Sequence, residues 1–550
     1  MASDANRIVI VGAGPTGLSL AIELGSRNIP CLVVERNDRV GYAPRAKTTN
    51  VRTRTHLRRW GLAGRLARES PFGVHYPSDV VFVTRLAGAF LAKVENASNC
   101  APERNALYPE HGQWVPQYKL EQVLREHVET LGSVKLRFST EFVTAVQDES
   151  SVRVTVRDRA TGREEALICE YLVGADGARS AVRDLIGASM QGEYGLSRNY
   201  NIVFRAPGLA QAHGHGPATM YWQTHPAAPS LIGPMDRDDV WFFMPTRLRD
   251  GFDISDEDAI DLIRDATGID LPYEILSRDE WVASALIADR YRRGRIVLAG
   301  DACHLHPPFG GYGMNMGISD GVDLGWKLTA LLRGWGGPRL LASYQAERRP
   351  VHDEVIGEAR ANHAILSNDF WRDGLEADTV EGEALRREMG ARIVASKTRE
   401  FHTLGTVLGT YYQNSPIILP DVEGRATRTS AEYTPSSEAG CLAPHLWRED
   451  GRSLYDLFGA GFTLVCRPDA NPAPALAEAL AAGIPLELVW LGTDEGDDLY
   501  PKHLTLVRPD QHVAWRGDLW KSDVLLRAAG WDVTGESADR AVATSGSVGR

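Results

Sequence analysis

The amino-terminal end of the chain alternates between short apolar runs and polar turns, a pattern typical of a strand, a helix and a second strand. Ile8–Val11 is a β-branched run, Leu18–Leu24 repeats apolar residues at helical spacing, and Cys31–Glu35 is a second strand-like run. Two strands that enclose a helix within so short a stretch run parallel in a sheet. The pattern therefore predicts a parallel α/β fold for this part of the chain.

Further along the chain, the pattern predicts both antiparallel and parallel elements. Residues 152–156 alternate, and residues 166–173 return after a polar turn, which predicts a hairpin. The aromatic-rich stretch Met220–Pro245 alternates with polar residues, so we expect an antiparallel sheet with one covered face. A buried strand is expected over 296–299, and helices are expected over 318–332, around 351–371 and over 381–400.

The last part of the chain has the pattern of a separate small α/β domain. Residues 414–440 are rich in Pro, Gly, Ser and Thr with little periodicity, so we interpret them as a linker. The tail from Thr534 is rich in Ser, Gly, Thr and Ala and is expected to be disordered. Between these segments the pattern predicts strand, helix, strand and hairpin, over Phe462–Cys466, Ala475–Ala482, Leu486–Leu491, Leu504–Val507 and Val513–Trp515.

Composition and charge narrow the class of protein. The 550 residues are too many for one core and suggest about three or four domains or subdomains. A net charge of −12 disfavours nucleic-acid binding, because neutralising phosphates requires clustered Lys and Arg. The six cysteines lack metal-ligand or redox spacing and indicate a reduced set. No signal peptide and no membrane-length apolar stretch are present, so we expect a cytoplasmic protein without membrane partners.

A glycine-rich turn follows the first strand and opens the first helix. Its sequence, Gly12-Ala13-Gly14-Pro15-Thr16-Gly17, allows a tight turn, close backbone approach to a pyrophosphate, and tight packing of helix on strand. The helix N-terminus adds unpaired N–H groups and the positive end of a dipole. Glu35, which Arg36 follows, can bond ribose hydroxyls and suits an unphosphorylated ribose. The turn therefore predicts a dinucleotide site for FAD or NAD, with an accidental turn as the alternative.

A second glycine-rich segment, residues 300–317, follows the expected strand at 296–299. Asp301 is placed to accept hydrogen bonds from the ribityl hydroxyls of FAD. Its glycines let backbone N–H groups approach the pyrimidine edge of the flavin, and the following helix directs its positive end at flavin N1 and O2. The alternative is a loop that only reverses the chain. The predicted contacts here are Asp301, Gly311, Gly313, Met314 and Asn315.

Three blocks of sequence carry a resemblance to a known family. They are Gly300-Asp301-Ala302-Cys303-His304-Leu305-His306-Pro307-Pro308 with Gly313, Asn315, Gly317, Asp320 and Trp326-Lys327-Leu328; Pro44-Arg45-Ala46 with Arg58-Arg59-Trp60-Gly61; and Asp176-Gly177 with Arg179 and Arg183. Together they resemble the group A flavoprotein monooxygenases, of the para-hydroxybenzoate and phenol hydroxylase type, over roughly residues 5–365. Beyond residue 430, Cys441-Leu442-Ala443-Pro444-His445 and Leu506-Val507-Arg508-Pro509-Asp510 resemble the thioredoxin-like C-terminal domain of phenol and aromatic polyketide hydroxylases, without its redox CxxC.

The resemblance implies an α/β fold with a Rossmann-like FAD-binding domain of the glutathione-reductase type. It also implies an inserted β-sheet substrate domain and a thioredoxin-like C-terminal domain that is structural or forms a homodimer. The implied divisions are FAD-binding over 1–75, 105–184 and 280–370; substrate-binding over 76–104 and 185–279; helices and linker over 371–430; thioredoxin-like over 431–533; and a disordered tail over 534–550.

The resemblance further implies a reaction. Such enzymes bind FAD, use NADPH or NADH without a separate nicotinamide domain, and form a flavin C4a-hydroperoxide with dioxygen. That peroxide hydroxylates an electron-rich ring, so we expect a phenolic or polycyclic, polyketide-like aromatic substrate. Arg45 and Asp176 would serve the FAD pyrophosphate and the transient nicotinamide, and Gln117 the flavin side chain. Pro308 would place its carbonyl at the flavin edge, and the predicted catalytic positions are Arg45, Pro308, Gly310 and Gly311.

The sequence defines the substrate contacts and a catalytic base less narrowly. Tyr221, Trp222 and Phe243 are candidates for a pocket wall, with ordinary sheet packing as the alternative. His225, Asp236 and Tyr221 are candidates for a base that deprotonates a phenol, and none of them is preferred.

Two other features have simpler explanations than function. His304 and His306 lie two residues apart, near Asp301, without a third ligand, so we predict no metal site. Arg54 and Arg58 belong to an arginine-rich helical segment that we interpret as a solvated face rather than an anion site.

Several positions depart from the family pattern. Gly310 and Tyr312 stand where some relatives have glutamine, and Thr55 stands where many have an acid. The segment Asp320-Gly321-Val322-Asp323 replaces the more frequent Asp-Ala-x-Asn, which favours a bulky polycyclic substrate. The alternatives to aromatic hydroxylation are a Baeyer–Villiger or other flavin-dependent oxidation, and a non-catalytic FAD-binding protein.

Asp301→Ala should lose most of the bound FAD, because the substitution removes a hydrogen-bond partner of the ribityl chain. The ratio of flavin to protein absorbance in the purified variant, relative to the wild type, measures this loss. Unchanged occupancy would refute the role assigned to Asp301, and a folded but colourless wild-type protein would refute FAD binding altogether.

Overall fold

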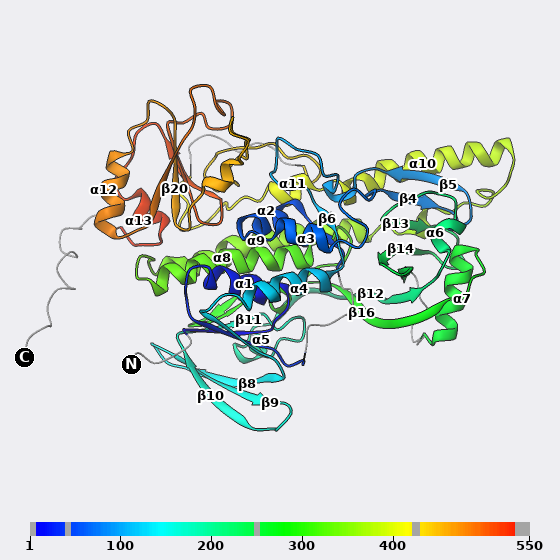
Figure 1. Ribbon diagram of the computed structural model, residues 1–550, viewed down its shortest axis with the longest axis horizontal. Coiled ribbons are helices and arrows are strands. Elements are labelled where there is room, and N and C mark those ends of the chain that lie inside the picture. Colours follow the sequence, from blue (N-terminus) through cyan, green and yellow to red (C-terminus); the bar gives the residue numbers. More distant parts are fainter. Residues whose placement is uncertain (1–6, 39–45, 247–253, 421–428, 534–550) are drawn as a thin grey trace, which may run out of the picture.

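The structure is a computed structural model that describes residues 7–38, 46–246, 254–420 and 429–533 (Figure 1). Arg45 and the expected tail over 534–550 lie outside the described residues. The described chain has a parallel sheet and its helices at the centre, a larger sheet on one side and a small C-terminal domain on the other (Figure 1).

The central layer is a six-stranded sheet of order β17-β18-β11-β1-β2-β7, parallel except for β17. The three elements expected at the amino-terminal end are confirmed as β1 (Ile8–Val11), α1 (Pro15–Gly25) and β2 (Cys31–Val34). The other members are β7 (Val134–Arg137), β11 (Tyr171–Gly174), β17 (Arg292–Arg293), β18 (Ile296–Leu298) and the covering helix α8 (Gly313–Leu332).

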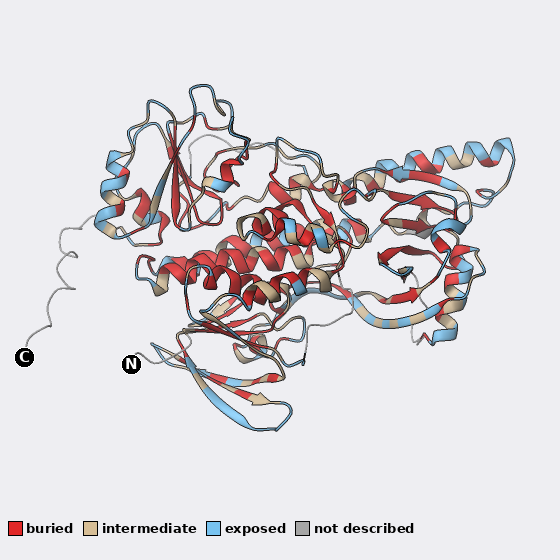
Figure 2. Ribbon diagram, in the orientation of Figure 1, coloured by how far each residue is buried: buried red, intermediate tan, exposed pale blue. Residues whose placement is uncertain are grey.

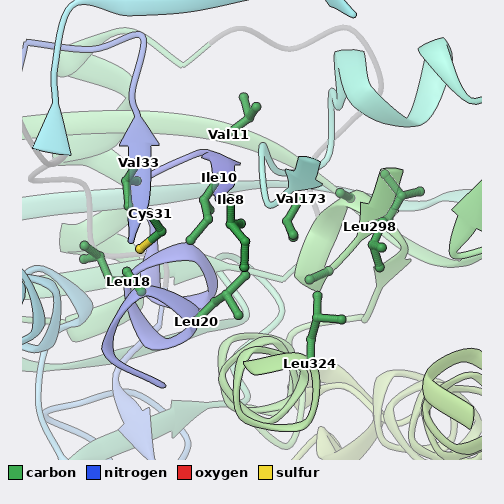
Figure 3. Packing of buried hydrophobic residues seen from close by; sticks show 14 of the residues in the cluster. Ile8, Ile10, Val11, Leu18, Leu20, Cys31, Val33, Val173, Leu298 and Leu324 are labelled. Atoms are coloured by element: carbon green, nitrogen blue, oxygen red, sulfur yellow. The ribbon is translucent and has the colours of Figure 1, made fainter. Parts of the chain in front are cut away.

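The core beneath this sheet is apolar. Ile8 and Ile10 of β1 pack with Leu18 and Leu20 of α1, and Leu324 of α8 belongs to the same buried cluster (Figure 3). Burying a Leu or Ile side chain contributes about 1.5–3 kcal/mol each. Figure 2 shows that α8 is buried along nearly its whole length.

Helices α1 and α8 pack so closely that α8 carries glycines at the contact. A Cβ atom at Gly321 would lie 2.9 Å from the backbone nitrogen of Leu20, and Cβ atoms at Gly317 and Gly325 would overlap side chains of α1. Their spacing of four residues places the three glycines on one face of the helix. Small side chains on this face therefore allow the two backbones to approach each other.

A three-stranded antiparallel sheet of order β10-β9-β8 lies beside the central layer. Its hairpin confirms the prediction for β9 (Val152–Asp158) and β10 (Glu164–Cys169). The single returning strand expected over 166–173 is wrong, because β10 ends at Cys169 and β11 then enters the parallel sheet. The split follows burial, since β10 is largely exposed whereas β11 is buried. The remaining strand is β8 (Thr140–Gln147).

The largest sheet has eight strands and is covered on both faces. One face packs against α7 (Asp256–Thr267), and the other packs against α10 (Val380–Phe401). The expectation of one covered face over Met220–Pro245 is therefore wrong. The order is β19 (His304–Leu305), β16 (Glu274–Ala288), β12 (Met190–Arg205), β15 (Val240–Pro245), β14 (Ser230–Asp236), β13 (Met220–Gln223), β4 (Val80–Val83) and β5 (Phe90–Val94).

Helices after residue 300 differ from expectation mainly where they begin. α8 begins at Gly313 rather than 318, and α9 (Arg339–His363) begins and ends earlier than the helix expected around 351–371. Pro350 lies inside α9, where buried residues on both sides keep the helix packed although the proline lacks an N–H donor. The helix expected over 381–400 is confirmed as α10.

The C-terminal domain agrees with its predicted pattern. Its sheet has the order β21-β20-β22-β23, in which β20 pairs parallel with β21 and antiparallel with β22. Within 414–420 and 429–440 the described chain has no helix or strand, as expected for a linker. The elements are β20 (Phe462–Cys466), α12 (Ala473–Ala482), β21 (Leu486–Trp490), β22 (Leu504–Val507), β23 (Val513–Gly517) and α13 (Val524–Ala528).

The remaining elements are short or connect the sheets. None of the helices that the structure describes is long and apolar enough to cross a membrane. These elements are β3 (Thr48–Thr49), α2 (Val51–Arg59), α3 (Ala63–Glu69), β6 (Gln113–Trp114), α4 (Gln117–Val128), α5 (Ala181–Leu185), α6 (Leu209–Ala212), α11 (Leu404–Leu408) and the 3-10 turns η1 (Ala97–Asn99), η2 (Gly300–Ala302), η3 (Ser367–Phe370) and η4 (Leu454–Leu457).

A buried ion network joins the C-terminal domain to α8 and α9. Arg508 donates to Glu347 Oε1 at 2.6 Å, to Asp323 Oδ1 at 3.0 Å and to Asp510 Oδ2 at 2.6 Å. Lys327 donates to Asp323 Oδ2 at 2.8 Å and to Glu347 Oε2 at 2.6 Å. All five side chains are almost fully removed from solvent. Two cations therefore pair with three buried carboxylates across the domain boundary.

Arg508→Met should destabilise the protein by about 3–5 kcal/mol, because removing one partner leaves buried charges uncompensated. Urea denaturation followed by tryptophan fluorescence measures the change in the free energy of unfolding. Lys521→Met is the control, since Lys521 is exposed in the same domain and its loss should change stability by less than about 0.5 kcal/mol. Equal unfolding curves for the two variants would contradict a stabilising network.

Candidate active site

The predicted motifs meet at one edge of the central sheet. β1 leads into Gly12, β2 into Glu35, β11 into Ala175 and β18 into Gly300. Because these four strands are parallel neighbours, their carboxyl ends open on the same side, where ligands of such sheets bind. The structure thus brings together motifs that lie far apart in the sequence.

The glycines of the first turn serve different purposes. Gly12 has a φ of +108°, and a Cβ atom there would lie 2.8 Å from the carbonyl carbon of Ala175. A Cβ atom at Gly17 would overlap the carbonyl oxygen of Gly12. A Cβ atom at Gly14 would meet nothing within 4 Å, so this position faces open space before α1. Two of the glycines are thus required by protein packing. The third, Gly14, leaves open the space before α1, which we call the cradle.

Two helix N-termini point to this edge without a side-chain cap. α1 begins at Pro15 after Gly14, and α8 begins at Gly313 after Tyr312, with no capping hydrogen bond from either preceding side chain. Helix N-termini carry unpaired N–H groups and partial positive charge, which suit a pyrophosphate or an anionic ring edge. The two open helix ends and the clear cradle at Gly14 fit a dinucleotide such as FAD.

The acidic residues of the motifs differ in how they are held. Glu35 accepts from the backbone N–H of Ala13 at 3.0 Å, so it also fixes the glycine turn, while the Arg36 side chain is exposed. Asp176 accepts from the hydroxyl of Ser180, at the start of α5, and burial raises the pKa of its carboxyl. Asp301 is exposed at the end of β18. Of these three residues, Asp301 is exposed, whereas Glu35 and Asp176 are partly buried.

The second glycine-rich loop is fixed by its own hydrogen bonds. Gly311 N–H donates to the carbonyl of Pro308 at 3.1 Å, and both Gly310 and Gly311 have positive φ, +100° and +66°. A Cβ atom at Gly310 would overlap the Tyr312 ring. Glycine at 310, where some relatives have glutamine, therefore belongs to a tight turn over a buried tyrosine.

Asn315 and Gln117 use their side chains inside the protein. Asn315 accepts from the Thr53 hydroxyl at 2.7 Å and donates to the carbonyls of Thr48 at 2.9 Å and Gly311 at 2.7 Å. Gln117 donates from Nε2 to Glu121 at 2.6 Å. A cofactor contact of Asn315 is thus limited to the backbone, in the first turn of α8.

A buried cluster supports the end of β18. Asp320 accepts from Gly300 N–H at 3.0 Å and from Arg348 Nε at 2.7 Å, and it lies 2.8 Å from His304 Nε2. Although burial acts in the opposite direction, His352 and Arg348 hold the pKa of Asp320 well below its usual value. The sequence did not reveal Arg348 and His352, which lie one helical turn apart on α9.

Ligand-type atoms of Cys303, His304 and Asp320 lie within 4.8 Å of one another, an arrangement the prediction of no metal site did not anticipate. Burial raises the pKa of the Cys303 thiol well above its usual value, and Arg348 already pairs with Asp320. These two properties favour a hydrogen-bonded cluster that supports the loop over a metal site. The predicted absence of a metal stays a prediction.

The candidate pocket residues fall on opposite faces of the large sheet. Trp222 faces the glycine-rich loop, where its ring centroid lies 6.0 Å from that of Phe309. Tyr221 and Phe243 point into the opposite cluster, with α7, so the structure does not bring the three together. We call the face with the loop the loop-facing cluster; it includes Val203, Trp222, Leu231, Met235, Phe242 and Phe309.

The candidate bases are also separated. His225 lies 2.7 Å from Arg85, and burial together with Arg85 lowers the pKa of its imidazole. Tyr221 donates to a backbone carbonyl on the far side of the sheet. Asp236 accepts from Tyr118, one residue after Gln117 on α4, which places it beside the loop-facing cluster. Of the three candidates, Asp236 is thus the one that reaches the central domain.

The arginine-rich helix α2 is not a solvated face. The Arg54 side chain is 2% exposed and pairs with Glu110 at 3.0 Å. Arg58, 31% exposed, donates to Glu110 at 2.9 Å and to Asp456 of the C-terminal domain at 2.7 Å. The expectation of solvated arginines is therefore wrong, because acidic partners come from segments distant in the sequence.

Comparison with known proteins agrees with this geometry. A family model described as FAD binding domain matches residues 6–359, and one described as the C-terminal domain of aromatic-ring hydroxylases matches residues 436–536. The chain therefore belongs to the FAD-dependent aromatic-ring hydroxylases. The predicted family, fold class, enzyme class and FAD cofactor are confirmed.

Individual relatives match along nearly the whole chain. Tetracenomycin B2 monooxygenase-dioxygenase of Streptomyces olivaceus is 32% identical over 544 residues, covering 94% of this chain and 96% of that protein. Phenol 2-monooxygenase of Pseudomonas sp. (strain EST1001) is 31% identical over 578 residues, covering 94% and 90%. The flavin-dependent monooxygenase PieE, solved with FAD and substrate, has a TM-score of 0.85 and 29% identity, covering 96% and 98%.

Gly14→Ala should weaken FAD retention without destabilising the FAD-free protein, because its Cβ would enter the clear cradle and touch no protein atom. Flavin content after gel filtration and the melting temperature of the FAD-free protein measure the two effects separately. Gly132→Ala is the matched control, since its Cβ also meets nothing within 4 Å but lies in the turn after α4. Equal flavin content in the two variants would show that Gly14 does not border the cofactor.

Proposed function

We propose that this monooxygenase hydroxylates a phenolic or polycyclic, polyketide-like aromatic compound with NADPH or NADH as the reductant. The chemistry that FAD supplies when bound is to take up hydride from the nicotinamide and to activate dioxygen. The names of the relatives support this substrate class, since they include a phenol 2-monooxygenase and a tetracenomycin B2 monooxygenase-dioxygenase. A cytoplasmic location and a homodimer stay predictions.

The observation that carries the proposal is the contact between the glycine-rich loop and the large sheet. Phe309, in the loop between Pro308 and Gly310, packs against Trp222 of β13. An aromatic substrate held against this apolar surface would lie beside the loop that begins α8. An apolar surface of this kind would orient a ring and keep water from the reacting atoms.

The cofactor would occupy the carboxyl edge of the central sheet. We propose that α1 and its turn hold the pyrophosphate, Glu35 and Arg36 border the ribose, and Asp301 bonds the ribityl chain. The start of α8 would face the flavin ring, with Pro308 and Gly310 at its reacting edge. The further residues that we assign to the cofactor are Gly12, Gly14, Pro15, Thr16, Gly17, Gln117, Asp176, Gly311, Gly313, Met314 and Asn315.

The flavin-loaded enzyme should oxidise NADPH or NADH faster when a suitable arene is added, and should insert one oxygen atom into it. A panel of phenols, naphthols and anthraquinones, each also tested as its methyl ether, measures the rate, the peroxide released and the product mass. Retention of an intact hydroxylated ring supports the proposal. Insertion between two carbons would establish a Baeyer–Villiger oxidation instead, and peroxide without product for every compound would contradict the proposed substrate class.

A further inference from the structure

Lys47 lies where the central domain meets the large sheet, and no predicted motif includes it. Its carbonyl accepts from Val115 N–H at 2.8 Å, and the preceding Ala46 carbonyl accepts from Gln117 N–H at 2.9 Å. The next residue, Thr48, accepts from Asn315 at 2.9 Å. The Lys47 backbone is therefore fixed between the start of α4 and the start of α8.

The Lys47 side chain reaches from this anchored backbone to the loop-facing cluster. Its Nζ lies 3.1 Å from the centroid of the Phe242 ring. Phe242 has room because the facing residue on β14 is Gly233, whose Cβ would lie 2.8 Å from the ring. The ammonium thus lies beside the cluster that contains Trp222 and Phe309.

Lys47 has no ionic partner among the described residues, which is unusual for a desolvated ammonium. Lysines usually extend their charged end into water or pair with a carboxylate when they are buried. The comparison within the cluster is Lys397, whose Nζ lies 4.2 Å from the Trp222 ring but also pairs with Glu400. For Lys47, burial without a counter-charge lowers the pKa to about 7.

Three other titratable side chains border the same cluster. Tyr118 donates to Asp236, and Lys397 pairs with Glu400. His363 stacks against Phe309 with centroids 5.3 Å apart, and burial lowers the pKa of its imidazole. Lys47 is the one cation at this cluster, within the described part of the chain, that has only a ring as its partner.

We propose that Lys47 accepts the proton of the substrate's acidic hydroxyl and then binds the resulting phenolate oxygen. The substrate O–H bond breaks and an N–H bond forms on the neutral amine, so a neutral pair becomes an ammonium–phenolate pair without an oxidant or reductant. The phenolate is the more electron-rich form of the ring, which favours attack on activated oxygen. The inference rests on the proposed function and narrows it to substrates with an ionisable hydroxyl.

Alizarin, a dihydroxyanthraquinone whose visible spectrum differs between phenol and phenolate, tests the ammonium–phenolate pair on the flavin-loaded enzyme near pH 6, where an amine with a pKa of about 7 is mostly protonated. Wild type should bind alizarin as the phenolate. Lys47→Met should bind it in the neutral form, and its affinity should be at least about tenfold below that of the wild type, because a charge-assisted hydrogen bond is lost. Lys47→Arg should still bind the phenolate, but the pH profile of turnover should lose its ionisation near 7, because arginine does not release its proton.

Two controls separate this inference from packing and from the proposed function. Lys119→Met removes a neighbouring half-buried lysine on α4 and should leave alizarin binding unchanged. The dimethyl ether of alizarin, which has no acidic proton, should bind wild type and Lys47→Met equally.

The outcomes are distinguishable. The role of Lys47 would be overturned if Lys47→Met bound alizarin as the phenolate with wild-type affinity. It would also be overturned if the wild type bound only the neutral form, or did not bind alizarin at all. In each case the proposed function stands if the wild type carries flavin and hydroxylates another member of the aromatic panel. Absence of flavin or of arene-stimulated NAD(P)H oxidation would instead contradict the proposed function itself.

Discussion

The arrangement of the site depends on the close contact of two helix backbones. Gly317, Gly321 and Gly325 leave no side chain between α8 and α1, so the helices meet almost directly. Because the end of β18 also packs against Thr16 of α1, the two helices begin at the same edge of the sheet. Their positive ends therefore point to the edge of the sheet where we propose that the cofactor binds. A larger residue on this face would separate the two halves of the cofactor site.

The sequence was sufficient for the parts of the fold governed by local pattern. The β1–α1–β2 unit and the C-terminal domain follow directly from apolar spacing, and the glycine motifs follow parallel strands that end at one edge of the sheet. The role of Gly321, by contrast, became clear only from the fold. The segment Asp320–Asp323 had suggested a polycyclic substrate, whereas its glycine has a packing reason and its acids join buried ion networks.

Properties that depend on contacts between distant segments were not accessible from the sequence. Whether Phe242 or Phe243 faces the loop depends on strand register, which one position reverses. The buried state of Arg54 depends on Glu110, and that of Asp320 depends on Arg348. Lys47 could not be identified from the sequence for the same reason, since a single lysine forms no pattern. Its position against the Phe242 ring is visible only in the structure.

The charge network at Arg508 has a consequence for how this enzyme class can diversify. Two of its carboxylates, Asp323 and Glu347, belong to α8 and α9, whereas its guanidinium and Asp510 belong to the terminal domain. A chimera that took its terminal domain from a homologue without the arginine would inherit uncompensated acids in its interior. A stable exchange of this domain therefore requires matching changes on α8 and α9.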